Sequence, residues 1–214
     1  MSIRSLEILV EDRSTEQALH HLVPKIAPGS FVEFNIRSFD GKHALLKRLP
    51  DRLRGYADRF RFDPGLRILV VVDLDDDDCN ELKQKLEAMA TSSGIPTLRS
   101  ANSAELPVVA TRIAIEELEA WFIGDIHALR TVYPRVPQSL GERHKFRLPD
   151  AVKGGTWEAL ERLLQSHGYH QGGLRKIALA DEVARHMDVE ANRSPSFCCL
   201  RDGLRRLTSW KATV

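Results

Sequence analysis

The stretch Leu69-Val70-Val71-Val72-Asp73-Leu74-Asp75-Asp76-Asp77-Asp78 decides the fold of this chain. A continuous run of branched apolar residues is typical of a parallel strand that is buried on both faces. The run ends in five carboxylates within six residues. Ligands of open α/β sheets bind just beyond the carboxyl ends of the strands. Carboxylates this close repel one another unless water or a cation compensates them. The stretch therefore predicts a parallel sheet with a divalent metal site at its carboxyl edge.

The composition is that of a globular protein. The chain has 214 residues, of which 43% are hydrophobic and 29% charged, enough to build a sizeable core. Its 31 Lys and Arg balance 30 Asp and Glu, so any nucleic-acid surface must be a local basic patch. Cys79, Cys198 and Cys199 form no CxxC pair, which predicts a reducing, cytoplasmic location. We expect no membrane segment and no signal peptide, because charges interrupt every apolar run.

Strand and helix patterns alternate along the first 125 residues. Strands are expected over 5–10, 31–36, 67–73 and 108–115, with a short one over 95–98. Helices are expected between them, over about 14–26, 41–60, 78–90 and 116–123. This order predicts an α/β fold with a mostly parallel sheet flanked by helices.

Local signals define several helix ends. Ser14 and Gln17 match a capping box that begins the first helix, and Pro24 is expected to end or kink it. Asp78 or Asn80 can cap the helix after the central strand. Beyond residue 125, glycine and proline breakers separate three further helical patterns. We therefore expect an α/β domain over 1–125 and a helical C-terminal extension packed on it over 126–214.

Acidic residues follow three of the expected strands. Glu11 follows the first, and Asp73 and Asp75 end the central one. If these strands are neighbours, the three carboxylates converge at one edge of the sheet. Alternate residues of an extended segment point the same way, so Asp73 and Asp75 can hold one ion together. Glu117 and Glu119 follow the strand over 108–115 and can hold a second ion or act as a general base.

Oxygen ligands of this kind suit Mg²⁺ or Mn²⁺, which can activate water and neutralise a phosphodiester. Lys176 is a candidate for stabilising phosphate charge. The candidate metal ligands are Glu11, Asp73, Asp75, Asp77, Glu117 and Glu119, and the candidate catalytic residues are Glu11, Asp73, Asp75 and Lys176.

Each acidic run also has a purely structural interpretation. The aspartates over 76–78 can be a solvated loop that favours the start of the next helix, and the glutamates over 116–119 an exposed helix start. Basic residues over 42–61 and 201–206 can be solvated faces or phosphate contacts. No pair of histidines has zinc-site spacing, and no Walker A, GxGxxG or GxSxG motif is present.

Two of these segments carry a resemblance to a known family. Glu11-Asp-Arg-Ser-Thr-Glu16 and Asp73-Leu-Asp75 resemble the Toprim pattern of topoisomerases, primases and the nucleases of the overcoming-lysogenization-defect type. More narrowly, the chain resembles the Toprim-like family of domain of unknown function 4276. That resemblance rests on 11–16, on Ile113-Ala-Ile-Glu-Glu-Leu-Glu-Ala-Trp-Phe122, and on the tail from Gly172-Gly-Leu-Arg-Lys through Asn192-Arg-Ser-Pro-Ser-Phe197.

The resemblance implies a Rossmann-like sheet with a metal held by Glu11, Asp73 and Asp75. It also implies a bacterial protein, often encoded beside an ABC-type ATPase and suspected in anti-phage defence. Toprim domains usually carry glycine directly after the first glutamate, where Asp12 instead adds a charge and a side chain.

We therefore expect an Mg²⁺-dependent nuclease, a hydrolase of phosphodiester bonds in DNA or RNA. One alternative is a non-catalytic regulatory or sensor subunit of an ATPase complex, with a degenerate acidic site. Another is an Mg²⁺-dependent phosphotransferase for a small molecule. Whether the protein is a homodimer is left open.

Overall fold

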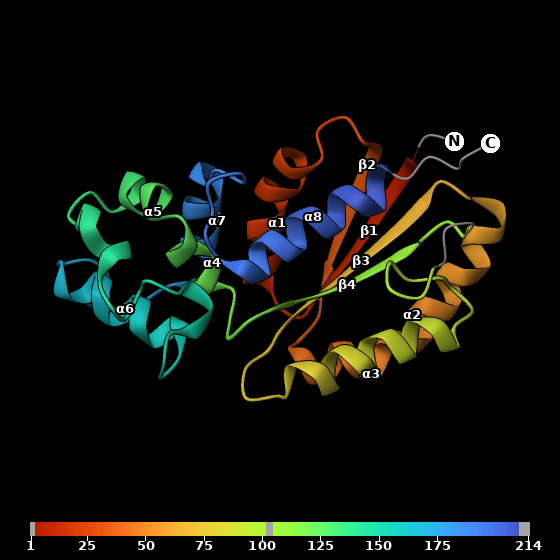
Figure 1. Ribbon diagram of the computed structural model, residues 1–214, viewed down its shortest axis with the longest axis horizontal. Helices are drawn as coiled ribbons and strands as arrows, with labels where there is room; N and C mark the ends of the chain where they lie inside the picture. Colours follow the sequence, from red (N-terminus) through yellow and green to blue (C-terminus); the bar gives the residue numbers. More distant parts are fainter. Residues whose placement is uncertain (1–2, 102–104, 210–214) are drawn as a thin grey trace.

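A parallel sheet forms the centre of the computed structural model, which describes residues 3–101 and 105–209. Its four strands lie in the order β2-β1-β3-β4 (Figure 1). All eight residues of β3 are buried, as the apolar run predicts. The expected α/β fold with a parallel sheet is thus confirmed. The strands are β1 (Ile3–Val10), β2 (Phe31–Ser38), β3 (Leu66–Asp73) and β4 (Val109–Ala114).

Helices cover both faces of the sheet (Figure 1). Alternate residues of β3 point to opposite faces. Ile68 and Val70 share a core with α2 (Lys42–Phe62) and α3 (Cys79–Ser92). Leu69 and Val71 share another core with α1 (Arg13–Ile26) and α8 (Pro195–Ser209). Two hydrophobic layers therefore hold the sheet.

A helical lobe lies beyond the carboxyl ends of the strands (Figure 1). The chain leaves it through α8, which packs along the sheet next to β4. One continuous core joins this face of the sheet to the lobe, and the fully buried Trp121 and Phe197 are among its largest side chains. The lobe contains α4 (Glu119–Gly124), α5 (Ile126–Val132), η1 (Gln138–Glu142), η2 (Pro149–Ala151), α6 (Thr156–Ser166) and α7 (Lys176–His186).

Several predicted details differ in the structure. The short strand expected over 95–98 is an isolated bridge between Thr97 and Val109. Helix α1 continues through Pro24 and ends at Ile26. Its N-cap is Asp12, so the capping box predicted at Ser14 is wrong. Ser14 already lies inside the helix.

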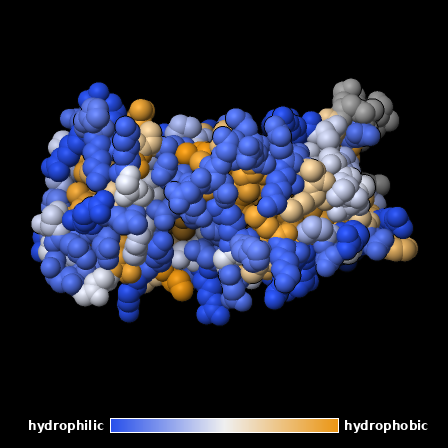
Figure 2. Space-filling view, turned by 90° about the horizontal axis from the view of Figure 1, so that it is seen from below, coloured by the Kyte–Doolittle hydropathy of each residue, from blue (hydrophilic) through white to orange (hydrophobic). Residues whose placement is uncertain are grey.

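The outer surface is mostly hydrophilic when the molecule is seen from the side of α2 and α3 (Figure 2). Apolar side chains break this surface in small areas only. In the part of the chain that the structure describes, no helix combines the length and the apolar character needed to cross a bilayer.

Candidate functional site

Three buried carboxylates lie at the carboxyl ends of three neighbouring strands. Glu11 directly follows β1, Asp73 ends β3, and Glu119 begins α4 shortly after β4. These residues are only 8%, 8% and 2% exposed. Because β1 pairs with β3 and β3 with β4, all in parallel, the three strand ends share one edge. We call these three residues the carboxylate cluster.

Burial and, after it, repulsion by neighbouring acids disfavour ionisation of Asp73. Burial raises the pKa of its carboxyl well above the ordinary value, and Glu11, Glu119 and Asp12 raise it further. A hydrogen bond that the Leu118 backbone N–H donates to this carboxylate acts in the opposite direction. The site therefore concentrates more negative charge than its own hydrogen bonds compensate.

Glu11 carries an oxygen that has no partner. Burial and the nearby Asp75 raise its pKa to about 7, although Lys42 and a hydrogen bond from the Asp73 backbone N–H lower it. Within the described residues, the buried Oε2 atom accepts no hydrogen bond. Buried polar atoms are nearly always paired, so this oxygen marks a position for a cation or water.

Lys176 brings a positive charge from the helical lobe. Burial raises the pKa of Glu119 to about 7, and Lys176 acts to lower it. Burial works against the Lys176 ammonium, but Glu119, Glu117 and Asp73 together raise its pKa. Its Nζ atom also lies 4.3 Å from the centre of the Trp157 ring, a cation–π contact. The lysine therefore stays charged beside the cluster.

Glu117 connects the cluster to the lobe. Its Oε1 atom lies 3.6 Å from Lys176 Nζ. Its Oε2 atom accepts hydrogen bonds from the Trp157 backbone N–H at 2.8 Å and from the Thr156 hydroxyl at 3.1 Å. Helix α6 begins there and has no cap of its own at Gly155. Glu117 thus substitutes for the missing cap, and its role as a metal ligand stays a prediction.

The aspartates after β3 leave the direction of the strand. The backbone of Asp75 is left-handed, with a φ of 48°, so the alternation expected for Asp73 and Asp75 does not apply. Lys42 Nζ lies 2.7 Å from Asp75 and 2.8 Å from Asp77. Asp75 remains near enough to Glu11 to raise the pKa of the Glu11 carboxyl. Asp77 is exposed in this ion pair, and nothing in the geometry links it to the cluster.

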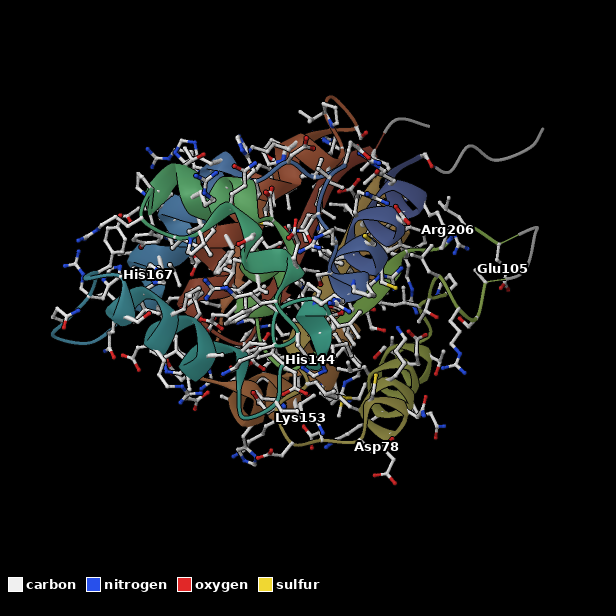
Figure 3. All side chains as sticks on the ribbon, turned by 60° about the vertical axis from the view of Figure 1, so that its left-hand side comes forward. Asp78, Glu105, His144, Lys153, His167 and Arg206 are labelled. Carbon is white, nitrogen blue, oxygen red and sulfur yellow. The ribbon has the colours of Figure 1, made fainter. Side chains whose placement is uncertain are left out.

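Asp78 serves the helix that follows. Its Oδ1 atom accepts hydrogen bonds from the backbone N–H groups of Asn80 and Glu81, both at 2.9 Å. Figure 3 shows Asp78 at the outer rim of the molecule, at the start of α3. This is the helix-capping function that the sequence allowed for the end of the aspartate run.

Two strained backbone positions flank the cluster. Glu116, after β4, has a φ of 62° and, like Asp75, is not glycine. The Asp75 backbone N–H donates to the Glu116 carbonyl at 2.9 Å, so the two positions support each other. Left-handed conformations of non-glycine residues cost free energy and concentrate at functional sites. Sequence patterns carried no signal for either position.

Asp12 has two roles that the sequence did not reveal. Its Oδ1 atom accepts a hydrogen bond from the Thr15 backbone N–H at 2.8 Å and caps α1. Its charge also raises the pKa values of Glu11, Asp73 and Glu119. Asp12 is thus a fourth acid beside the cluster. Aspartate is a preferred N-cap residue, so its place directly before the helical pattern could have predicted the cap.

Much of the basic surface expected for phosphate contacts is already paired. Arg59 of α2 lies 2.8 Å from the buried Glu7, and Lys42 pairs with the aspartate loop. Arg205 of α8 pairs with Glu190. Phosphate contacts by these three side chains would require breaking an ion pair.

The cluster suits a hard cation by its chemistry. Its donors are carboxylates only, the ligands that Mg²⁺ and Mn²⁺ prefer, and one buried oxygen of Glu11 is unpartnered. Across residues 3–101 and 105–209, however, no three His, Cys, Asp or Glu side chains are close enough to form a ready ligand set. The side chains supply the charge and the donor type that such an ion prefers.

Comparison with known proteins identifies one family. The family model described as Domain of unknown function (DUF4276) matches residues 10–205, from the end of β1 into α8. No curated protein and no solved structure matches. The matched range contains the whole carboxylate cluster and Lys176.

Proposed function

This chain belongs to the family described as Domain of unknown function (DUF4276), and we propose that it is a metal-dependent phosphodiesterase that cleaves nucleic acid, with a Toprim-like site. One observation carries the proposal. Three buried carboxylates meet at the carboxyl ends of neighbouring parallel strands, where one oxygen of Glu11 has no partner among the described residues. Chemistry in open α/β folds takes place at this edge.

Glu11 and Asp73 would hold one Mg²⁺ or Mn²⁺ ion, with Asp75 at the rim of the site. A bound ion would neutralise charge on the phosphodiester and lower the pKa of coordinated water. Lys42 holds Asp75 at 2.7 Å and so fixes the loop beside the ligands. The metal would also offset the repulsion that Lys176 and Lys42 compensate only in part.

Lys176 and Glu119 would act on the substrate itself. Lys176 is charged and half-exposed, so its ammonium can contact phosphate oxygens and stabilise the charge that develops on them. Glu119 has a pKa of about 7 and can give or take a proton near neutral pH. That property suits a general acid for the departing oxygen. Glu117 positions Lys176 from 3.6 Å.

The wider setting rests on the resemblance alone. We propose that the protein works in the cytoplasm with an ABC-type ATPase, in defence against phage. The alternative, a regulatory subunit of such a complex, would keep the cluster as a structural feature without turnover.

Cleavage assays with labelled DNA and RNA test the proposal. Wild type is expected to cleave at least one of them with Mg²⁺ or Mn²⁺ and not with EDTA. Asp73→Asn preserves the shape of the side chain and is expected to abolish cleavage. Asp77→Asn alters an exposed acid outside the cluster and is expected to keep activity within a few-fold.

Absence of cleavage with either metal would favour the regulatory subunit. Cleavage that survives Asp73→Asn would show that the activity does not come from this site. Circular dichroism of each variant checks that the fold is intact.

A further inference from the structure

The outer edge of β2 is unpaired in the described part of the chain. β2 is the terminal strand of the sheet and pairs only with β1. The Phe39 backbone N–H donates to the Val10 carbonyl, so odd-numbered residues of β2 direct their backbone groups to β1. The backbone N–H and C=O groups of Phe34 and Ile36 therefore point away from β1, toward the open edge of the sheet. A free edge of eight residues is a template for another strand.

Two opposite charges lie on the exposed face of this edge. Glu33, Asn35 and Arg37 alternate along β2, so their side chains share one face, and all three are exposed. Within the described residues, Glu33 and Arg37 take part in no ion pair. They are four residues apart, roughly 13 Å along a strand, and cannot pair with each other. Neither charge is therefore neutralised by an ion pair among the described residues.

We propose that a second copy of this chain pairs antiparallel with this edge, with Asn35 on the two-fold axis. Glu33 then lies opposite Arg37 of the second copy, and Arg37 opposite its Glu33. Phe34 lies opposite Ile36 of the second copy, which joins two half-buried apolar side chains. The pairing is isologous, and it merges the two sheets into one.

The backbone supports the same register. Phe34 and Ile36 both direct their N–H and C=O groups outward, so their pairing is of the hydrogen-bonded kind. Glu33 and Arg37 then form non-hydrogen-bonded pairs, in which side chains approach most closely. Sliding the second strand by two residues places Arg37 opposite Phe31 or Asn35, and both ion pairs are lost. Charge and hydrogen bonding therefore select one register.

Sedimentation velocity over a range of concentrations tests the assembly. Wild type is expected to approach twice 24.2 kDa as the concentration rises. Glu33→Arg and Arg37→Glu each create two like-charge pairs and are expected to weaken the dimer at least about tenfold. An equimolar mixture of the two variants restores two opposite-charge pairs in the heterodimer, and its affinity is expected to return toward that of wild type.

Cysteine cross-linking tests the register independently. Asn35 would face its own copy across a non-hydrogen-bonded pair, with Cα atoms about 4.5 Å apart, a separation that a disulfide can span. Asn35→Cys is therefore expected to cross-link into dimers on mild oxidation. Glu33→Cys, two residues away, is the matched control and is expected to remain uncross-linked. Wild type oxidised in parallel corrects for the three native cysteines.

A monomeric wild type at all concentrations would overturn the proposal. So would single-charge variants that dimerise as wild type does, or a mixture that fails to recover affinity. Circular dichroism of the variants separates loss of pairing from loss of fold. None of these measurements depends on enzymatic activity.

Discussion

Replacing Glu119 with glutamine is expected to stabilise the metal-free protein at alkaline pH. Glu119 is 2% exposed, and burial raises its pKa from 4.5 to about 7. Because the folded-state pKa is the higher one, the protonated carboxyl favours folding. This contribution is complete below about pH 4.5 and is lost as the pH rises through about 7. At about 1.4 kcal/mol per pKa unit, the loss at pH 9 reaches about 3 kcal/mol.

Glutamine has nearly the same shape and no charge, so Glu119→Gln avoids this loss. Urea unfolding with EDTA at pH 5 and pH 9 measures the difference. The variant is expected to gain about 3 kcal/mol over wild type at pH 9 and less than about 1 kcal/mol at pH 5. Glu142→Gln changes an exposed glutamate of η1 and is expected to show no pH-dependent gain.

Two results would refute this reasoning. If Glu119→Gln gains no more at pH 9 than at pH 5, the carboxyl does not ionise at a cost inside the fold. If the variant is less stable than wild type at pH 9, the attraction of Lys176 outweighs burial. In that case the cluster would be a stabilising feature.

Four further outcomes follow from the geometry. Mg²⁺ at about 100 times its dissociation constant is expected to raise the melting temperature of wild type by roughly 5–10 °C, and an equal rise in Asp73→Asn would contradict binding at the cluster. Because the pKa of Glu11 is about 7, calorimetry should show Mg²⁺ affinity rising from pH 6 to pH 8, whereas a constant affinity would argue against Glu11 as a ligand. Asp12→Ala should lose about 1 kcal/mol of unfolding free energy in urea and Asp12→Asn much less, since only asparagine can replace the cap; equal losses would exclude that role. Gly124→Ala places a methyl group 2.9 Å from the Ser194 backbone nitrogen and should cost about 1–3 kcal/mol in thermal unfolding, while an unchanged melting temperature would show that the neighbouring loop yields.

The central strand and the acidic residues at its carboxyl end follow from local sequence. A run such as Leu69 to Val72 can be satisfied only by burial on both faces, and such burial implies a parallel sheet with helices on both sides. The sequence predicted that Glu11 and Asp73 lie close together only on the condition that β1 and β3 are neighbouring strands. The sheet order supplies that condition.

The remainder of the site depends on tertiary contacts. Five aspartates in six residues look alike in sequence, and a left-handed turn at Asp75 separates the buried acid from those that Lys42 pairs. Similarly, Glu117 and Glu119 follow the same strand, yet Glu117 caps α6 and Glu119 is buried beside Lys176. Their difference arises from how the lobe docks, which a periodic pattern does not encode.

The lobe completes the site by holding the positively charged Lys176 beside the acids. Burying several acids together is costly unless a positive charge accompanies them, and Lys176 supplies one from the first residue of α7. The far end of α7 is fixed to α1, because Lys25 Nζ donates to the carbonyls of Arg185 at 2.6 Å and Met187 at 3.0 Å. Lys25 of α1 thus fixes one end of α7, and the opposite end of α7 carries Lys176. The sequence pattern changes from alternating strands and helices to helices alone at residue 125. This boundary therefore divides the site, since the acids lie before it and Lys176 lies after it.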